Sequence, residues 1–321
     1  MSPQTMRVGA IDIGSNSIRL LVADVATGDA RGLETVSRAG EPCRLGKGLD
    51  SGGTIDPFLA ERCAELAREF VRRARSLGVR HIVVGATAAL RGASNGADVA
   101  ALIGERIGVP VRILSGEDEA RLVYRSVTLG LKEAARRSAC VVFDLGGGST
   151  EVVSGLGPEA GRWASLPFGA VSLTERFVRG NPAAPAEIEA VAAEVHHVLM
   201  HECALMPESA PLFAGVGGTV TVLASLDRGI TIYEPALLEG WSIAADRLDQ
   251  LTRRVAGSTE EERCHWPVLG RGRSDIVVAG SIVIRELAHR FQAQGMMCST
   301  QGLRYALARL AAEEASPSAG P

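Results

Sequence analysis

Hydrophobic and polar positions divide this chain into two kinds of segment. Short apolar runs rich in Val, Ile and Ala, such as residues 81–86 and 139–143, are typical of buried strands. Longer stretches, such as residues 57–77, place apolar residues at helical spacing. Because the two kinds follow one another, the pattern predicts an α/β fold, in which glycine turns at the carboxyl ends of the strands bind ligands.

The expected elements follow from this pattern and from turn and cap residues. We expect strands of a hairpin at 7–25 and about 32–40, a helix at 57–77, strands and turns at 141–177, a helix within 180–205, and strand, glycine turn and helix units at 81–99, 109–131, 211–226 and 274–291. The tail at 313–321, rich in Ser, Pro and Ala, is expected to be disordered.

Two strand-like regions are interrupted by the same polar pattern. "IDIGSNSI" begins at Ile11, and "FDLGGGSTEV" begins at Phe143, so that Asp12 and Asp144 hold equivalent places. One such turn is typical of an ordinary hairpin, but two copies, each at the start of one half of the chain, predict the two halves of a phosphate clamp.

Each residue type in the pattern has a chemical reason. A carboxylate can hold a hydrated Mg²⁺ or another divalent cation that bridges to phosphate. Glycines let backbone N–H groups approach phosphate oxygens, and hydroxyl groups add further donors. The expected phosphate-binding residues are Gly14, Ser15, Ser17, Gly146, Gly147, Gly148, Ser149, Thr150, Gly217 and Gly218. The expected metal ligands are Asp12 and Asp144.

The composition adds size and charge to this picture. With 321 residues the chain exceeds the size at which one core stops growing, so two domains are expected. The formal net charge is −3 and the only lysines are Lys47 and Lys132, so no nucleic-acid partner is expected. Six scattered cysteines, no signal peptide and no long apolar run predict reduced thiols in a cytoplasmic protein with no membrane partner.

Further strings carry a resemblance to a known family. The paired loops resemble the superfold shared by actin, Hsp70 and the sugar kinases. Within it the chain is similar to the Ppx/GppA family of exopolyphosphatases and guanosine pentaphosphate phosphohydrolases, from about residue 7 to residue 310, through the strings "IDIGSNSIRLLVAD", "GATAALRGASNG", "ILSGEDEARL", "FDLGGGSTEVV", "LPFGAVSLTERF", "GVGGTVTVLA" and "GRGRSDIVVAGSIVI". The resemblance implies two actin-like (ribonuclease H-like) domains with a phosphate-binding cleft between them.

The same resemblance implies roles for three side chains. Glu119 corresponds to the general base that activates water, Glu151 to a residue that binds the metal and positions that water, and Arg91 to a phosphate-binding arginine. It also implies that Asn16 lines the phosphate channel and that Glu151 joins Asp12 and Asp144 as a metal ligand. From composition alone Glu119 cannot be told from Glu117 and Asp118, because acids are common in the first turn of a helix.

The implied activity is that of a metal-dependent exopolyphosphatase, which hydrolyses the terminal phosphate of inorganic polyphosphate with water activated by Glu119. The alternatives are hydrolysis of the 5′ phosphate of pppGpp, a phosphotransferase, and a non-catalytic polyphosphate or nucleotide sensor. We expect domains at 1–125, joined by a helix at 305–321, and at 126–304, and we leave open a homodimer. Longer members of the family carry an additional helical C-terminal region, so a preference for short polyphosphate chains is expected here.

Overall fold

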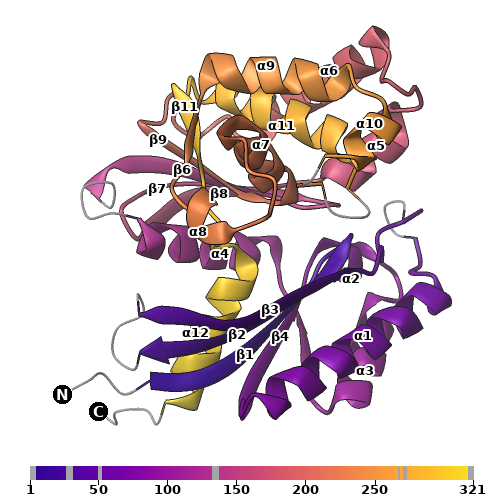
Figure 1. Ribbon diagram of the computed structural model, residues 1–321, viewed down its shortest axis with the longest axis vertical. Helices are drawn as coiled ribbons and strands as arrows, with labels where there is room; N and C mark the ends of the chain where they lie inside the picture. Colours follow the sequence, from indigo (N-terminus) through magenta and orange to yellow (C-terminus); the bar gives the residue numbers. More distant parts are fainter. Residues whose placement is uncertain are drawn as a thin grey trace. The chain divides into compact units, whose positions relative to one another are not determined.

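The computed structural model describes residues 5–26, 32–49, 53–131, 137–266, 268–269 and 273–316 (Figure 1). It divides into two compact units, Met1–Leu122 with Leu303–Pro321, and Val123–Gly302. Each unit contains one mixed sheet covered by helices. The predicted α/β fold is confirmed, whereas the predicted domain boundaries and the predicted cleft stay predictions.

The first unit is built on a five-stranded sheet in the order β3-β2-β1-β4-β5. Its strands are β1 (Thr5–Ile13), β2 (Ser17–Ala26), β3 (Leu33–Pro42), β4 (His81–Ala86) and β5 (Val111–Ile113). Its helices are α1 (Pro57–Ser76), α2 (Ala88–Gly92), α3 (Gly96–Ile107) and α12 (Leu303–Ala315), and α4 (Gly116–Gly130) begins here and ends in the second unit. In Figure 1, α12 covers one face of this sheet while α1 and α3 cover the other, which explains why β1 is buried on both faces.

The second unit has a six-stranded sheet in the order β10-β11-β9-β6-β7-β8. Its strands are β6 (Ala139–Leu145), β7 (Thr150–Leu156), β8 (Glu159–Leu166), β9 (Leu212–Gly217), β10 (Ser242–Ala244) and β11 (Gly295–Cys298). Its helices are α5 (Ala170–Phe177), α6 (Pro185–Glu202), α7 (Gly218–Arg228), α8 (Pro235–Leu238), α9 (Ala245–Ala256), α10 (Glu260–Cys264) and α11 (Val277–Arg290), with α6 and α9 packed against α11.

The two sheets share one arrangement of strands. In the first, the antiparallel strands β1, β2 and β3 are followed by β4 and β5, which run parallel to β1. In the second, the antiparallel strands β6, β7 and β8 are followed by β9 and β11, which continue parallel to β6. The carboxyl ends of β1, β4 and β5 therefore lie at one edge of the first sheet, and those of β6, β9 and β11 at one edge of the second.

Most of the expected elements are present, with five corrections. Residues 7–25 form two strands separated by a turn, and residues 81–99 contain the short helix α2 and the start of α3 in place of one helix. The segment 274–291 contains no strand among its described residues, because its apolar run is the first part of the buried helix α11. Residues 170–177 are helical rather than a turn, and Glu313–Ala315 of the expected disordered tail belong to α12. The rest of that tail, 317–321, and the predicted turn at 27–31 lie outside the described residues.

Candidate active site

Asp12 lies at the carboxyl end of β1, directly before the first polar turn. The turn is closed by the N–H of Gly14, which donates to the carbonyl oxygen of Ser17 at 3.0 Å. Asp12 is opposite Arg19 on β2. Burial raises the pKa of the Asp12 carboxyl group, and the charges of Arg19 and Arg304 partly offset this effect. A buried carboxylate with two arginines in its field is well placed for a charged ligand, including a cation that comes with phosphate.

A second segment holds the first turn in place from outside. The N–H groups of Cys43 and Arg44 both donate to the carbonyl oxygen of Asn16, and the N–H of Gly46 donates to that of Ser15. Ser15 is buried and Asn16 is half-buried. The predicted phosphate loop is therefore a fixed turn, whose shape depends on the residues that follow β3.

Arg91 and Glu119 come together from the next two strands of this sheet. Arg91 lies on α2, after β4, and Glu119 lies in the first turn of α4, after β5. The guanidinium Nη1 of Arg91 donates to Glu119 Oε2 at 2.8 Å and to the carbonyl oxygen of Leu114 at 2.9 Å. The predicted base and the predicted phosphate-binding arginine thus form an ion pair at the same sheet edge as Asp12.

The surroundings of the three acids in α4 differ. Ser115 Oγ donates to Asp118 Oδ2 and accepts from the Asp118 N–H, as expected for a cap of the helix. Glu117 forms an exposed pair with Arg121 one turn further along. Glu119 is the acid of the three whose side chain is buried, at 7% exposed, and it pairs with Arg91.

In the second unit, two predicted metal ligands are neighbours. Asp144 on β6 lies directly opposite Glu151 on β7, and Glu151 lies opposite Ser165 on β8. Directly opposed residues of an antiparallel pair place their Cβ atoms about 5 Å apart on one face of the sheet. Ser165 Oγ donates to Glu151 Oε1 at 2.8 Å, and Glu151 is only 2% exposed. The sheet thus places two carboxylates and a hydroxyl group in a row.

The glycine loop between β6 and β7 rests on the amino end of α5. The N–H of Ala170 donates to the carbonyl oxygen of Gly146, and the N–H groups of Val171 and Ser172 donate to that of Gly147. In a trans peptide the N–H points opposite to the carbonyl. The N–H groups of residues 147 and 148 therefore point away from α5, as a phosphate-binding loop requires.

The third glycine turn ends β9 and begins α7. Gly217 has φ 122°, a backbone conformation that residues with a side chain rarely adopt. In the parallel pairing of β9 with β6, Gly217 lies opposite Leu145 at the end of β6. The side chain of Arg273 packs against Gly218, where an added Cβ would lie 3.0 Å from Arg273 Cζ. The amino end of the 11-residue helix α7 and the Arg273 guanidinium thus lie next to each other, and both favour a bound anion.

Sequence reasoning missed Arg19, Ser165 and Arg273. Arg19 could have been found, because it stands seven residues after Asp12, as Glu151 stands seven residues after Asp144. The first copy of the repeat therefore carries a cation where the second carries an acid. Ser165 and Arg273 come from distant parts of the chain, and only the fold brings them to the site.

The donor set of the second unit fits a magnesium ion. Mg²⁺ prefers oxygen ligands and is commonly bound by one or two carboxylates together with water and phosphate oxygens. Asp144 and Glu151 provide two such carboxylates. Within the described ranges, no cluster of three or more His, Cys, Asp or Glu side chains forms a metal cage. The assignment of Asp12, Asp144 and Glu151 as ligands stays a prediction.

A comparison with known protein families assigns the chain to one of them. A family model described as the Ppx/GppA phosphatase family matches residues 21–308. The chain belongs to this family. It is also 32% identical to "Exopolyphosphatase 2" of Mycobacterium tuberculosis over 293 residues, which cover 89% of this chain and 91% of that protein. The chain is therefore a phosphoanhydride hydrolase of the Ppx/GppA type.

Solved structures agree with this family assignment. The crystal structure of the Ppx/GppA family member from Aquifex aeolicus superposes with a TM-score of 0.82 at 26% identity, and covers 98% of this chain and 100% of that chain. An exopolyphosphatase from Cytophaga hutchinsonii shares the fold, with a TM-score of 0.85 at 23% identity over 94% of this chain and 96% of that one.

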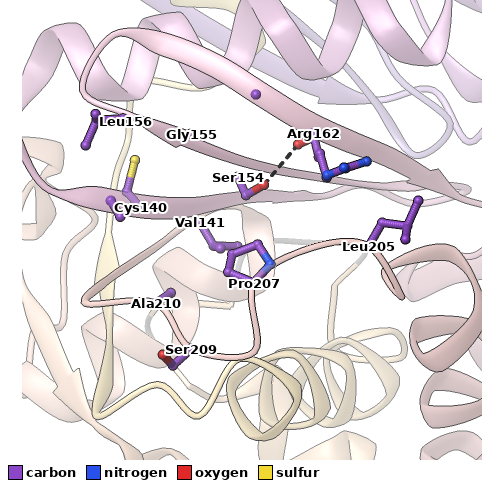
Figure 2. Close-up of a pocket in the computed structure, with 12 residues that line it drawn as sticks. Cys140, Val141, Ser154, Gly155, Leu156, Arg162, Leu205, Pro207, Ser209 and Ala210 are labelled. Atoms are coloured by element: carbon purple, nitrogen blue, oxygen red, sulfur yellow. Dashed lines mark hydrogen bonds between the residues drawn. The ribbon is translucent and has the colours of Figure 1, made fainter.

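A cavity of about 350 Å³ lies away from all the predicted site residues (Figure 2). Figure 2 shows Cys140 and Val141 at the start of β6 on one side, and Pro207 and Ser209 of the loop before β9 on the other. Cys140 and Val141 lie toward the amino end of β6, whereas Asp144 lies near its carboxyl end. The cavity is therefore separate from the candidate active site.

The helices carry a further negative result. Among the residues that the structure describes, no helix combines the length and apolar character needed to cross a membrane. The cytoplasmic location stays a prediction.

Proposed function

We propose that this Ppx/GppA protein is a divalent-metal-dependent exopolyphosphatase that releases the terminal phosphate of inorganic polyphosphate by direct attack of water. The observation that carries the proposal is the ion pair of the buried Glu119 with the half-buried Arg91, because hydrolysis of a phosphoanhydride needs a proton acceptor beside a phosphate-binding cation. The name of the Mycobacterium tuberculosis relative supports the same substrate class.

Glu119 is proposed to accept the proton of the attacking water. Its carboxylate is withheld from solvent, and Arg91 fixes one of its two oxygens at 2.8 Å. A guanidinium carries five N–H donors, so Arg91 has the capacity to hold Glu119 and to contact a phosphate oxygen with the same group. Base and phosphate would then be oriented by one side chain.

The glycine loops are proposed to bind the phosphate oxygens. Backbone N–H groups of the loops at 15–17 and 147–149, and of the amino end of α7, provide donors that carry no counter-charge of their own. They suit a substrate with one negative charge on every phosphate, because each donor stabilises an equatorial oxygen as charge develops there.

Asp144 and Glu151, together with Asp12, are proposed to hold Mg²⁺ or another divalent cation. When bound, the cation would neutralise phosphate charge. The side chain of Glu151 is kept in one orientation by Ser165, so the sheet and not the ligand determines where its carboxylate lies.

Phosphate release from three substrates tests the proposal. The purified protein is incubated with Mg²⁺ and, in parallel, with short-chain polyphosphate, long-chain polyphosphate and pppGpp, and the products are separated. We expect free phosphate from polyphosphate, and none after chelation of the metal. Release from pppGpp alone would replace polyphosphate by pppGpp as the substrate, and transfer of the phosphate to ADP or another acceptor would contradict hydrolysis.

A further inference from the structure

A short segment after β3, here called the buttress and comprising residues 43–48, packs directly against the first phosphate loop. Three of its N–H groups donate to carbonyl oxygens of that loop at 2.9 to 3.1 Å. The approach is so close at Gly46 that an added Cβ would lie 2.9 Å from the Cβ of Ser15. The buttress and the loop are therefore one unit of structure.

The backbone of the buttress is unusual at Arg44. Arg44 has φ 51°, which makes it one of two non-glycine residues with positive φ among those that the structure describes. This left-handed conformation costs free energy for a residue with a long side chain, and such outliers cluster at functional sites. Asn would adopt it more readily. The position thus has an arginine where the backbone would favour a smaller residue.

The buttress also carries a second cation. Lys47 is exposed, and its N–H donates to the carbonyl oxygen of Arg44 at 3.0 Å in the same turn. Lys47 is one of only two lysines in the chain. Two cations in one turn beside a phosphate loop fit a ligand whose negative charge continues beyond the phosphate that the loop holds.

We infer that Arg44 and Lys47 form a subsite for the inner phosphates of a polyphosphate chain, and that this subsite makes affinity depend on chain length. The inference rests on the proposed function, because it assumes that the loop at 14–17 binds the same chain. A nucleotide with a short phosphate tail would gain less from this subsite than an extended polyphosphate.

The test compares two double variants of matched charge. Arg44→Asn with Lys47→Gln removes the two buttress cations and keeps a residue that tolerates the left-handed backbone. Arg72→Gln with Arg75→Gln removes two exposed cations with the same spacing from α1. These control residues lie near the end of α1, close to Leu77, whose carbonyl oxygen accepts from Arg7 at the opposite end of β1 from the loop.

The measurement is KM and kcat for tripolyphosphate and for a longer polyphosphate of narrow length distribution. The buttress variant should raise KM for the longer chain roughly fivefold relative to tripolyphosphate, as expected for the removal of two solvent-accessible cations that pair with phosphate. The slope of log affinity against log salt should become shallower by about 0.7 for each phosphate that the variant no longer neutralises. Arg44→Lys alone should keep most of the affinity, and the α1 variant should behave as wild type.

Equal rises in KM for both substrates would overturn the inference, since a merely disturbed loop affects every chain alike. So would an unchanged ratio of the two KM values. Failure of the subsite and failure of the proposed function are told apart by measuring the binding of both polyphosphates in metal-free buffer, where no hydrolysis is expected. A wild-type protein that prefers the longer chain in binding but releases no phosphate would contradict the activity and leave the subsite standing.

Discussion

Glu119 differs from its two acidic neighbours in what surrounds it. Asp118 accepts a hydrogen bond from the capping residue Ser115, and Glu117 forms a solvent-exposed ion pair with Arg121. The Glu119 carboxylate, in contrast, is buried beside Arg91. Spacing alone cannot make this distinction, because all three acids fit the first turn of a helix. The sequence motif singled out Glu119, and the structure supplies a physical reason for preferring it.

The Asp12 carboxyl group gives a pH-dependent prediction. Because burial raises its pKa in the folded state, the folded protein binds more protons than the unfolded chain at pH values above the ordinary pKa of 3.8. Asp12 should therefore reduce stability increasingly as the pH rises through that window. In metal-free buffer at pH 7, Asp12→Asn should be more stable than wild type toward urea, while its phosphate release should be lost.

At pH 3 the difference in stability between Asp12→Asn and wild type should largely vanish, because both side chains are then uncharged. A variant that is less stable than wild type at pH 7 would contradict this account. It would mean that Arg19 and Arg304 stabilise the carboxylate by more than burial disfavours it.

At the scale of elements, the glycine loop depends on α5. An added Cβ at Gly169 would lie 2.5 Å from the carbonyl carbon of Gly147, a distance that real Cβ atoms do not reach. Gly169→Ala should therefore displace the loop, lower phosphate release by tenfold or more, in line with the roughly hundredfold effect of a 1 Å misplacement, and lower the melting temperature. Steady-state kinetics and thermal unfolding measure the two effects.

Gly302→Ala is the matched control, because its added Cβ would meet its nearest atom, Val216 Cβ, at 3.8 Å, an ordinary contact. It should keep near wild-type activity. If Gly169→Ala were as active as this control, the loop's position would not depend on its contact with α5.

The elements also show where sequence patterns stop being informative. Strand, glycine and helix units were predicted correctly at β9 and α7, where a buried strand meets Gly217. The same pattern failed at α11, since Val277–Ile284 are all buried and a helix covered on every side has no polar face to reveal its period. α5 was missed because its first turn is defined by contacts with the loop at 146–147, which are distant in sequence.

At the scale of the molecule, the chain returns to its first unit at its end. α12 packs on β1, β2 and β4, and Leu307 is fully buried, close enough to Gly85 that an added Cβ there would lie 2.9 Å from Leu307 Cδ1. Leu307→Ala should destabilise the first unit by about 2–5 kcal/mol. Leu205→Ala, at a side chain that is 73% exposed, should change stability by less than about 0.5 kcal/mol.

Tryptophan fluorescence shows whether Leu307→Ala destabilises the first unit alone. Trp163, Trp241 and Trp266 all belong to the second unit, so their fluorescence reports on it, whereas far-ultraviolet circular dichroism reports on both. Leu307→Ala should move part of the dichroism transition to lower urea and leave the fluorescence midpoint in place. A joint shift of both signals would mean that the two units unfold together and would contradict this expectation.

The repeated loop was visible in the sequence because its spacing is kept in both halves. The common strand order of the two sheets was not visible, because pairing between strands distant in sequence is decided by packing. The two sheets therefore repeat an arrangement of which the sequence showed only the loops.

The most direct test of the account is phosphate release by Glu119→Gln beside Glu117→Gln. The two changes are alike in chemistry and lie two residues apart in α4, but only Glu119 is buried against Arg91. Glu119→Gln should lower kcat by roughly 10²- to 10⁴-fold while polyphosphate binding persists, and Glu117→Gln should remain active. An active Glu119→Gln enzyme, or equal losses in the two variants, would contradict the proposal that Glu119 activates the attacking water.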